Sequence, residues 1–159
     1  MDWIAFTLFF LTCCVAASTG ALFPPNDWYK KLKKPFWNPP NWLFPIAWSI
    51  LYIIIAYVGM RISAISGSKN YLVALWALQI SFNTIWTPIF FGLNNIKLAM
   101  RFMVGLWVSV LLMVLTYWFE DTLSAILILP YFIWVSFAAA LNFRIMPVSY
   151  THLTLPTKA

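Results

Sequence analysis

Three apolar stretches of this sequence carry polar and aromatic side chains at helical spacing. Gln79, Asn83, Trp86 and Phe90 follow at intervals of four, three and four residues, which places them on one face of a helix. Two further stretches show a similar pattern: Tyr131, Trp134, Ala138 and Asn142 in one, and Phe44, Trp48 and Tyr52 in the other. Amides, hydroxyls and indoles on neighbouring helices can line a pocket for a flat apolar molecule.

The same spacing has a second interpretation, in which the two asparagines only join helices inside a bilayer, at about 0.6 kcal/mol each. Two observations favour a cavity. Trp48, Trp86 and Trp134 lie near the middle of their stretches, whereas tryptophan usually gathers at the headgroup boundary. Pro88 and Pro130 each remove a backbone N–H donor, which interrupts a helix and leaves room beside it.

The charged residues give little support to acid–base catalysis or ion coupling. The four carboxylates, at positions 2, 27, 120 and 121, lie at the ends of apolar stretches or between them. Proton relays and ion-coupled transporters usually place an ionisable residue at membrane depth. His152 has no metal-ligand partners in the sequence, and the adjacent Cys13 and Cys14 lack metal-site spacing, so no metal site is expected.

The elements that position these side chains are expected to be membrane-spanning helices. Of 159 residues, 63% are hydrophobic and 9% charged, so lipid must cover most of the surface. Five uncharged stretches are long enough to cross a hydrocarbon core of about 30 Å. They cover residues 3–23, 42–60, 71–96 (ending near 91), 102–119 and 122–143. The sequence therefore predicts an all-α membrane protein, a five-transmembrane-helix bundle.

The basic residues predict the orientation of this bundle. One side holds Arg61 and Lys69, and the other holds seven basic residues before the C-terminal tail: Lys30, Lys31, Lys33, Lys34, Lys97, Arg101 and Arg144. Basic residues favour the cytoplasmic side, so the C-terminus is expected to face the cytoplasm. The net charge of +6 is thereby assigned to topology and lipid headgroups, and no nucleic acid is expected as a partner.

The first stretch has a competing interpretation as a cleaved signal peptide, because VAASTGA resembles a cleavage site. Asp2 stands where a basic residue would be expected, and the apolar run is too long. We therefore expect a retained helix.

The first connection, PPNDWYKKLKKPFWNPPNW, has five prolines and four lysines. Residues 27–34 are expected to form one or two amphipathic turns, capped by Asp27 and stopped by Pro35. Two roles remain open for this connection. It folds over the mouth of a cavity as a lid, or its lysines and tryptophans anchor it at the headgroups.

Three segments resemble the signature segments of the TspO/MBR family of bacterial tryptophan-rich sensory proteins and mitochondrial translocator proteins. They are WNPPNWLFPIAW at residues 37–48, SFNTIWTPIFFG at 81–92 and LPYFIWVSFAAALNF at 129–143. The resemblance implies one five-helix domain over residues 1–146. Residues 147–159, PVSYTHLTLPTKA, do not resemble the family and are assigned to a non-native or disordered tail.

The resemblance also implies a cavity, opening near the first connection, that binds porphyrins such as protoporphyrin IX and haem as ligands; no obligatory cofactor is implied. Carried onto this sequence, the ligand site comprises Gly20, Tyr29, Pro39, Phe44, Trp48, Tyr52, Asn83, Trp86, Trp134, Ala138 and Leu141. A multi-pass protein of the bacterial cell envelope, often a homodimer, is implied as well. Some members carry a tyrosine-containing sterol-recognition segment where this chain has Phe143 and Arg144, which puts sterol binding in doubt here.

Three functions are compatible with these observations. The first is a membrane sensor or transporter that binds porphyrin between Trp48, Trp86 and Trp134. The second is an enzyme that degrades bound porphyrin with light and oxygen, for which Trp48 and Trp134 are the only catalytic candidates. The third is a regulatory scaffold that binds a sterol or a partner protein and dimerises through faces of small residues.

Overall fold

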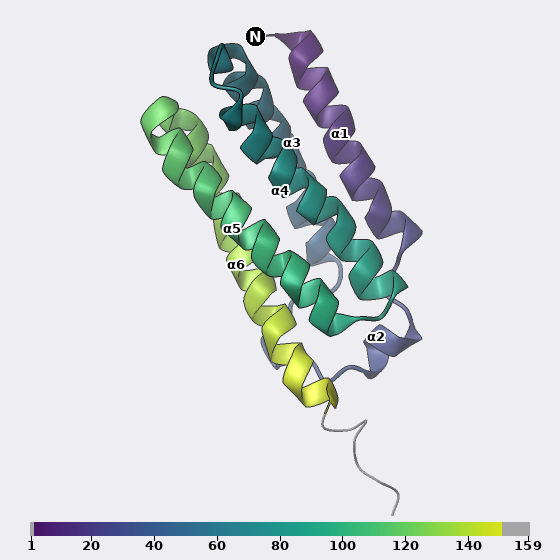
Figure 1. Cartoon of the computed structure of the whole chain (residues 1–159). Coiled ribbons are helices and arrows are strands. Elements are labelled where there is room, and N and C mark those ends of the chain that lie inside the picture. Colours follow the sequence, from purple (N-terminus) through teal and green to yellow (C-terminus); the bar gives the residue numbers. More distant parts are fainter. Residues whose placement is uncertain (1, 151–159) are drawn as a thin grey trace, which may run out of the picture.

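The structure, a computed structural model, describes the backbone of residues 2–150 and the side chains of residues 2–146. It is a bundle of long helices with a short helix, α2 (Asp27–Lys31), beside one end (Figure 1). The long helices are α1 (Trp3–Leu22), α3 (Leu43–Ser66), α4 (Tyr71–Thr87), α5 (Ile96–Glu120) and α6 (Thr122–Tyr150).

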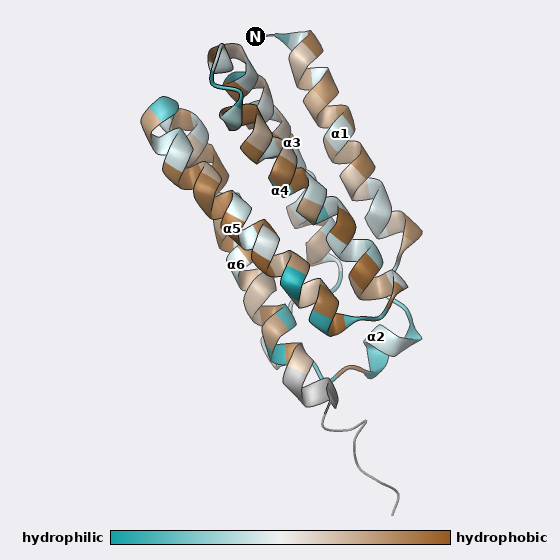
Figure 2. Cartoon of the chain, in the orientation of Figure 1, coloured by the Kyte–Doolittle hydropathy of each residue, from teal (hydrophilic) through white to brown (hydrophobic). Residues whose placement is uncertain are grey.

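Five helical segments of the described chain are long and apolar enough to cross a membrane, which confirms the predicted fold class. Apolar residues predominate along the helices, and hydrophilic residues gather toward their ends and in the connections (Figure 2). The helices α5 and α6 pack along each other, α4 packs on α5, and α1 packs on α3. Residues 151–159, most of the segment assigned to a tail, and His152 with them, lie outside the described residues.

Several helix boundaries differ from the predicted ones because a helix does not end where its first charged residue appears. The helix α3 continues past Met60 to Ser66, since Arg61 finds an acidic partner. The helix α5 begins at Ile96 instead of Phe102, because the Asn95 side chain accepts the Leu98 N–H at 3.0 Å and caps the first turn. Hydropathy marks the lipid-facing part of a helix, and capping and ion pairs decide its ends.

The two prolines act differently. Pro88 begins a π-helical turn, Pro88–Gly92, in which the Leu93 N–H donates to the Pro88 carbonyl at 3.0 Å. This wider turn carries Phe90 and Phe91 toward the short helix α2. At Pro130 the expected interruption is absent from the described backbone: α6 continues through this exposed residue.

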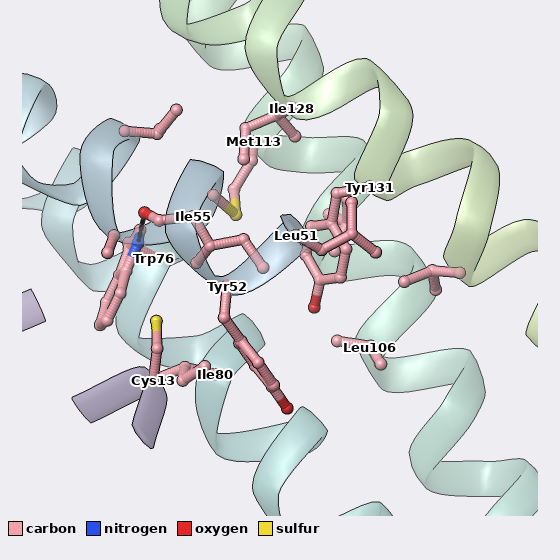
Figure 3. Packing of buried hydrophobic residues seen from close by; sticks show 14 of the residues in the cluster. Cys13, Leu51, Tyr52, Ile55, Trp76, Ile80, Leu106, Met113, Ile128 and Tyr131 are labelled. Carbon is pink, nitrogen blue, oxygen red and sulfur yellow. Dashed lines mark hydrogen bonds between the residues drawn. The ribbon is translucent and has the colours of Figure 1, made fainter. Parts of the chain in front are cut away.

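The N-terminal half of α1 packs tightly on α3 and α4. The Phe9 ring meets the Trp76 ring edge-on with centroids 4.6 Å apart, and the Trp76 indole donates to the Ile55 carbonyl at 2.9 Å. Gly59 permits this approach, because a Cβ there would lie 2.6 Å from Phe9. Figure 3 shows Trp76, Ile55 and Cys13 packed together in the core.

Two ion pairs join the helix ends at the opposite end of the bundle from α2. Arg61 donates to both oxygens of Asp121, each at 2.9 Å, and Ser124 donates to the same carboxylate. Lys69, in the connection between α3 and α4, pairs with Glu120 at the end of α5. The hydrogen bonds from Arg61 lower the pKa of the Asp121 carboxyl. Burial raises this pKa but offsets only part of the decrease.

Candidate ligand-binding cavity

A cavity of about 700 Å³ lies in the half of the bundle nearest α2. Its walls come from the C-terminal half of α1, the N-terminal half of α3, the end of α4 with its π-helical turn, and α6. Met103 and Leu106 of α5 also line the cavity, as do Tyr29 of α2 and Asn41 of the connection before α3. Small-molecule sites usually measure about 300–1,000 Å³, so the cavity has the size of such a site.

Most residues that the sequence places in a ligand site lie around this cavity. The lining includes Gly20, Tyr29, Phe44, Trp48, Tyr52, Asn83, Trp86, Trp134, Ala138 and Leu141. Pro39 is not part of the described lining, because the connection turns before α3 and presents Asn41 instead. The lining residues lie on α1, α3, α4 and α6, so the predicted stripes of α3, α4 and α6 face one another around the cavity.

Aromatic rings form much of the wall. Trp48 stacks on Tyr52 with ring centroids 5.3 Å apart, and Trp86 stacks on Phe90 at 4.9 Å. Phe44 meets Trp134 edge-on at 5.8 Å across the α3–α6 boundary. Such rings present flat apolar surface to whatever occupies the cavity.

A buried hydrogen-bond network connects three helices at the deep end of the cavity. The Tyr52 hydroxyl donates to Asn83 Oδ1 at 2.8 Å, and Asn83 Nδ2 donates to the Tyr131 hydroxyl at 3.0 Å. Tyr131 in turn donates to Gln79 Oε1 at 2.8 Å. Figure 3 shows the two tyrosines in the core cluster. Asn83 therefore fits both interpretations of its spacing, since it lines the cavity and also joins α3, α4 and α6.

Three other polar side chains in the lining are buried without a hydrogen-bond partner among the described residues. They are the indole N–H groups of Trp86 and Trp134 and both amide atoms of Asn142. Leaving such a group unpaired costs about 1–3 kcal/mol, so each unpaired group requires an explanation. The sequence-derived site omits Asn142, although its spacing from Trp134 and Ala138 had placed it on the same helix face.

The helix α2 is attached to the α4–α5 connection by Asn26. The Asn26 side chain accepts the Tyr29 N–H at 3.0 Å and donates to the Phe91 carbonyl at 3.0 Å. The predicted cap, Asp27, is wrong: Asp27 is exposed and pairs with Lys30. Asn26 takes the capping position because it precedes the first helical residue and also reaches the neighbouring turn.

Tyr29 brings α2 to the edge of the cavity. Its side chain is only 7% exposed and packs edge-on against Phe90 and Phe91. Burial raises the pKa of the Tyr29 hydroxyl. The Lys34 ammonium lies 3.9 Å from the centre of the Tyr29 ring, and partial burial lowers the pKa of this amine. A positive charge therefore stands beside the cavity.

The cavity lining is apolar and aromatic apart from a few polar side chains. Among the described lining residues, none carries an ionisable carboxylate, amine, guanidinium or imidazole. What the lining offers is ring surface, one bonded polar network and a few unpaired donors and acceptors. The titratable groups among these described side chains are the hydroxyls of Tyr29 and Tyr52.

The fold and the cavity together define a multi-pass integral membrane protein whose helices enclose an aromatic-lined internal site. The chain belongs to the TspO/MBR family, whose model matches residues 8–147.

Relatives in bacteria and mammals support this assignment. The chain is 46% identical over 148 residues to protein CrtK of Rhodobacter capsulatus, covering 91% of this chain and 92% of that protein. It is 40% identical over 150 residues to the tryptophan-rich sensory protein of Cereibacter sphaeroides, with 94% of each chain covered. It is 32% identical over 132 residues to the translocator protein of Sus scrofa, covering 80% of this chain and 78% of that one.

Proposed function

We propose that this membrane protein binds porphyrins such as protoporphyrin IX or haem in its internal cavity, as a sensor or transporter. The observation that carries the proposal is an uncharged described lining in which Trp48, Trp86 and Trp134 present flat ring surface. A tetrapyrrole is a large flat apolar ring, so stacking against indoles is its natural mode of burial.

The charge beside the cavity supports the same ligand class. Protoporphyrin IX carries two carboxylates along one edge of its ring, and the rest of its surface is apolar. Lys34 is half-buried against Tyr29 and stands where a carboxylate at the mouth of the cavity could be paired. An apolar ring inside and an acidic edge toward Lys34 would satisfy both ends of the ligand.

Titration with protoporphyrin IX in the dark, followed by tryptophan fluorescence, tests the proposal. We expect saturable quenching, and we expect Trp134→Ala to weaken binding about tenfold because the ligand loses an indole surface. Trp118→Ala is the matched control, since Trp118 is 49% exposed on α5 and is not part of the described lining. Quenching without saturation, or equal affinity in the two variants, would contradict the proposal.

We also propose that the connection between α1 and α3 closes the mouth of the cavity. Trp28 packs edge-on against Phe90 with centroids 5.7 Å apart, and Trp37 packs against Phe137 at 5.6 Å. With Tyr29, these rings attach the connection to the π-helical turn after α4 and to α6. An anchor at the headgroups would not need these contacts with the π-helical turn and with α6.

Hydrogen exchange distinguishes a lid from an anchor. With saturating protoporphyrin IX, amides of residues 27–41 are expected to exchange more slowly, because a lid gains contacts on binding. Residues 67–70, which connect α3 to α4 at the other end, serve as the internal control and should not change. Protection elsewhere in the cavity without protection across residues 27–41 would leave only the anchor.

The orientation follows from the charge distribution. The connection with Lys30, Lys31, Lys33 and Lys34 lies at the end of the bundle where the cavity has Tyr29 in its lining. By the positive-inside rule this end faces the cytoplasm. We therefore propose that ligand exchanges with the cytoplasmic side of the membrane.

A further inference from the structure

Two arginines on the outer surface of the bundle have no counter-charge among the described residues. Arg101 of α5 and Arg144 of α6 are both exposed, and neither side chain makes an ion pair or a hydrogen bond with a described residue. Arg61 is the contrast, because Asp121 binds its guanidinium through two hydrogen bonds.

The carboxylates of the chain lie away from these two arginines. Asp27 of α2 pairs with Lys30, and the other three lie at the opposite end of the bundle: Asp2, Glu120 and Asp121 (Figure 1). Within the described chain, no carboxylate is therefore placed to neutralise Arg101 or Arg144. An anion that pairs with them has to come from the surroundings of the protein.

The packing of α5 on α6 places the two arginines at nearly the same height. The Trp107 indole donates to Ser136 Oγ at 2.8 Å, which fixes the register of these antiparallel helices. Arg101 precedes Trp107 by six residues and Arg144 follows Ser136 by eight, which are rises of about 9 and 12 Å in the same direction. Figure 2 shows hydrophilic segments on α5 and α6 toward the end near α2.

This height corresponds to the headgroup boundary of a bilayer. Arg101 directly precedes the uncharged stretch 102–119, and Arg144 directly follows the uncharged stretch 122–143. In helical conformation these stretches are about 27 and 33 Å long, close to a hydrocarbon core of about 30 Å. Both guanidinium groups therefore reach the layer that contains the lipid phosphates.

The helix faces that carry the arginines are apolar further into the bilayer. Residues three, seven and eleven positions after Arg101, and residues eleven and eighteen positions before Arg144, share the face of their arginine. They are exposed and aliphatic: Val104, Val108 and Leu112 on α5, and Ile133 and Ile126 on α6. Each cation thus stands at the end of an apolar stripe that suits an acyl chain.

We propose that Arg101 and Arg144 form a binding site for the headgroup phosphate of an anionic phospholipid, whose acyl chains lie along the outer faces of α5 and α6. A guanidinium presents parallel N–H donors that match phosphate oxygens. Basic residues between helices at the membrane surface bind anionic headgroups in the same way. A zwitterionic headgroup brings its own cation beside the phosphate, so the site prefers a lipid with net negative charge. The site lies outside the cavity and is independent of the ligand proposed there.

Native mass spectrometry of the purified full chain tests the site. Phosphatidylglycerol and phosphatidylcholine with the same acyl chains are added in equal amounts. We expect the wild-type chain to retain phosphatidylglycerol about tenfold more strongly, and Arg101→Gln with Arg144→Gln to abolish this preference. Lys31→Gln with Lys33→Gln is the matched control: it removes two exposed positive charges from the same end of the bundle and should keep the preference.

Three outcomes would overturn the proposal. An equal loss of preference in both double variants would mean that general surface charge attracts the lipid. Displacement of phosphatidylglycerol by inorganic phosphate at millimolar concentration would mean that the site binds a free anion. A lower melting temperature of the arginine variant in phosphatidylcholine would assign the arginines to folding.

The dark titration with protoporphyrin IX separates this site from the proposed function. The arginine variant should bind protoporphyrin IX with wild-type affinity, because neither arginine is part of the described cavity lining. If the wild-type chain does not bind protoporphyrin IX but keeps its preference for phosphatidylglycerol, the proposed function fails and the lipid site stands.

Discussion

Replacing Gly20 with phenylalanine is expected to weaken protoporphyrin IX binding about 10- to 100-fold, which corresponds to roughly 1.4–2.7 kcal/mol. Gly20 lies in the cavity lining, and a Cβ placed on it meets no atom within 4 Å. A larger side chain therefore fits the protein without a clash at its root. The phenyl ring then occupies space that the ligand needs.

The helical position of Gly20 aims the new side chain into the cavity. Ala16 and Thr19, the buried residues on this part of α1, lie on the same face as Gly20. Ser18 lies on the opposite, exposed face and is not part of the described lining. Ser18→Phe is thus a control with the same added ring on the same helix.

Dark titrations of the two variants, with melting temperatures measured beside them, check the prediction. Gly20→Phe should lose affinity with its melting temperature retained, and Ser18→Phe should keep both. Equal affinity in the two variants would mean that protoporphyrin IX does not occupy this cavity.

Breaking the ion pair between Arg61 and Asp121 is expected to give the largest loss of stability, about 2 kcal/mol for Arg61→Met. The pair is bidentate, and its side chains are 30% and 15% exposed. Removing one partner from a fully buried pair costs about 3–5 kcal/mol. The loss of stability expected for Arg61→Met is smaller, because water or lipid headgroups reach the partly exposed Arg61 side chain.

A double-variant cycle isolates the pair. Asp121→Asn keeps a side chain that can hydrogen-bond at the start of α6 but removes the charge that Arg61 needs. If the pair acts as one unit, the double variant should lose less stability than the sum of the two single variants. The exposed pair of Lys30 and Asp27, at 71% and 85% exposed, is the control and should contribute almost nothing.

The same pair predicts a pH dependence of stability. The pKa of Asp121 lies lower in the folded protein than in the unfolded chain, so folding favours the charged carboxylate. This contribution is complete above about pH 4 and is lost as the pH falls through the folded-state pKa. Melting temperatures from pH 7 down to pH 3 should fall less steeply in Arg61→Met than in the wild-type chain.

The sequence predicts the number of spans well because a bilayer imposes a length and an apolar composition on each one. It predicts their ends poorly. Arg61 ends an uncharged run, yet α3 continues past it, since the carboxylate of Asp121, 60 residues further along the chain, pairs with its guanidinium. Asn26 replaces the predicted cap of α2 because it also bonds to the Phe91 carbonyl, a partner that local spacing does not reveal.

The stripes on α3, α4 and α6 are likewise contained in the sequence, because helical periodicity decides which side chains share a face. Periodicity does not say which faces meet. Asn83 and Asn142 have the same side chain and similar aromatic neighbours along their helices. Only the packing of α3 against α4 and α6 brings Tyr52 and Tyr131 to Asn83 and leaves both amide atoms of Asn142 without a hydrogen-bond partner among the described residues. Hydrogen bonding depends on distances of about 3 Å between separate helices, and the tertiary structure alone determines those distances.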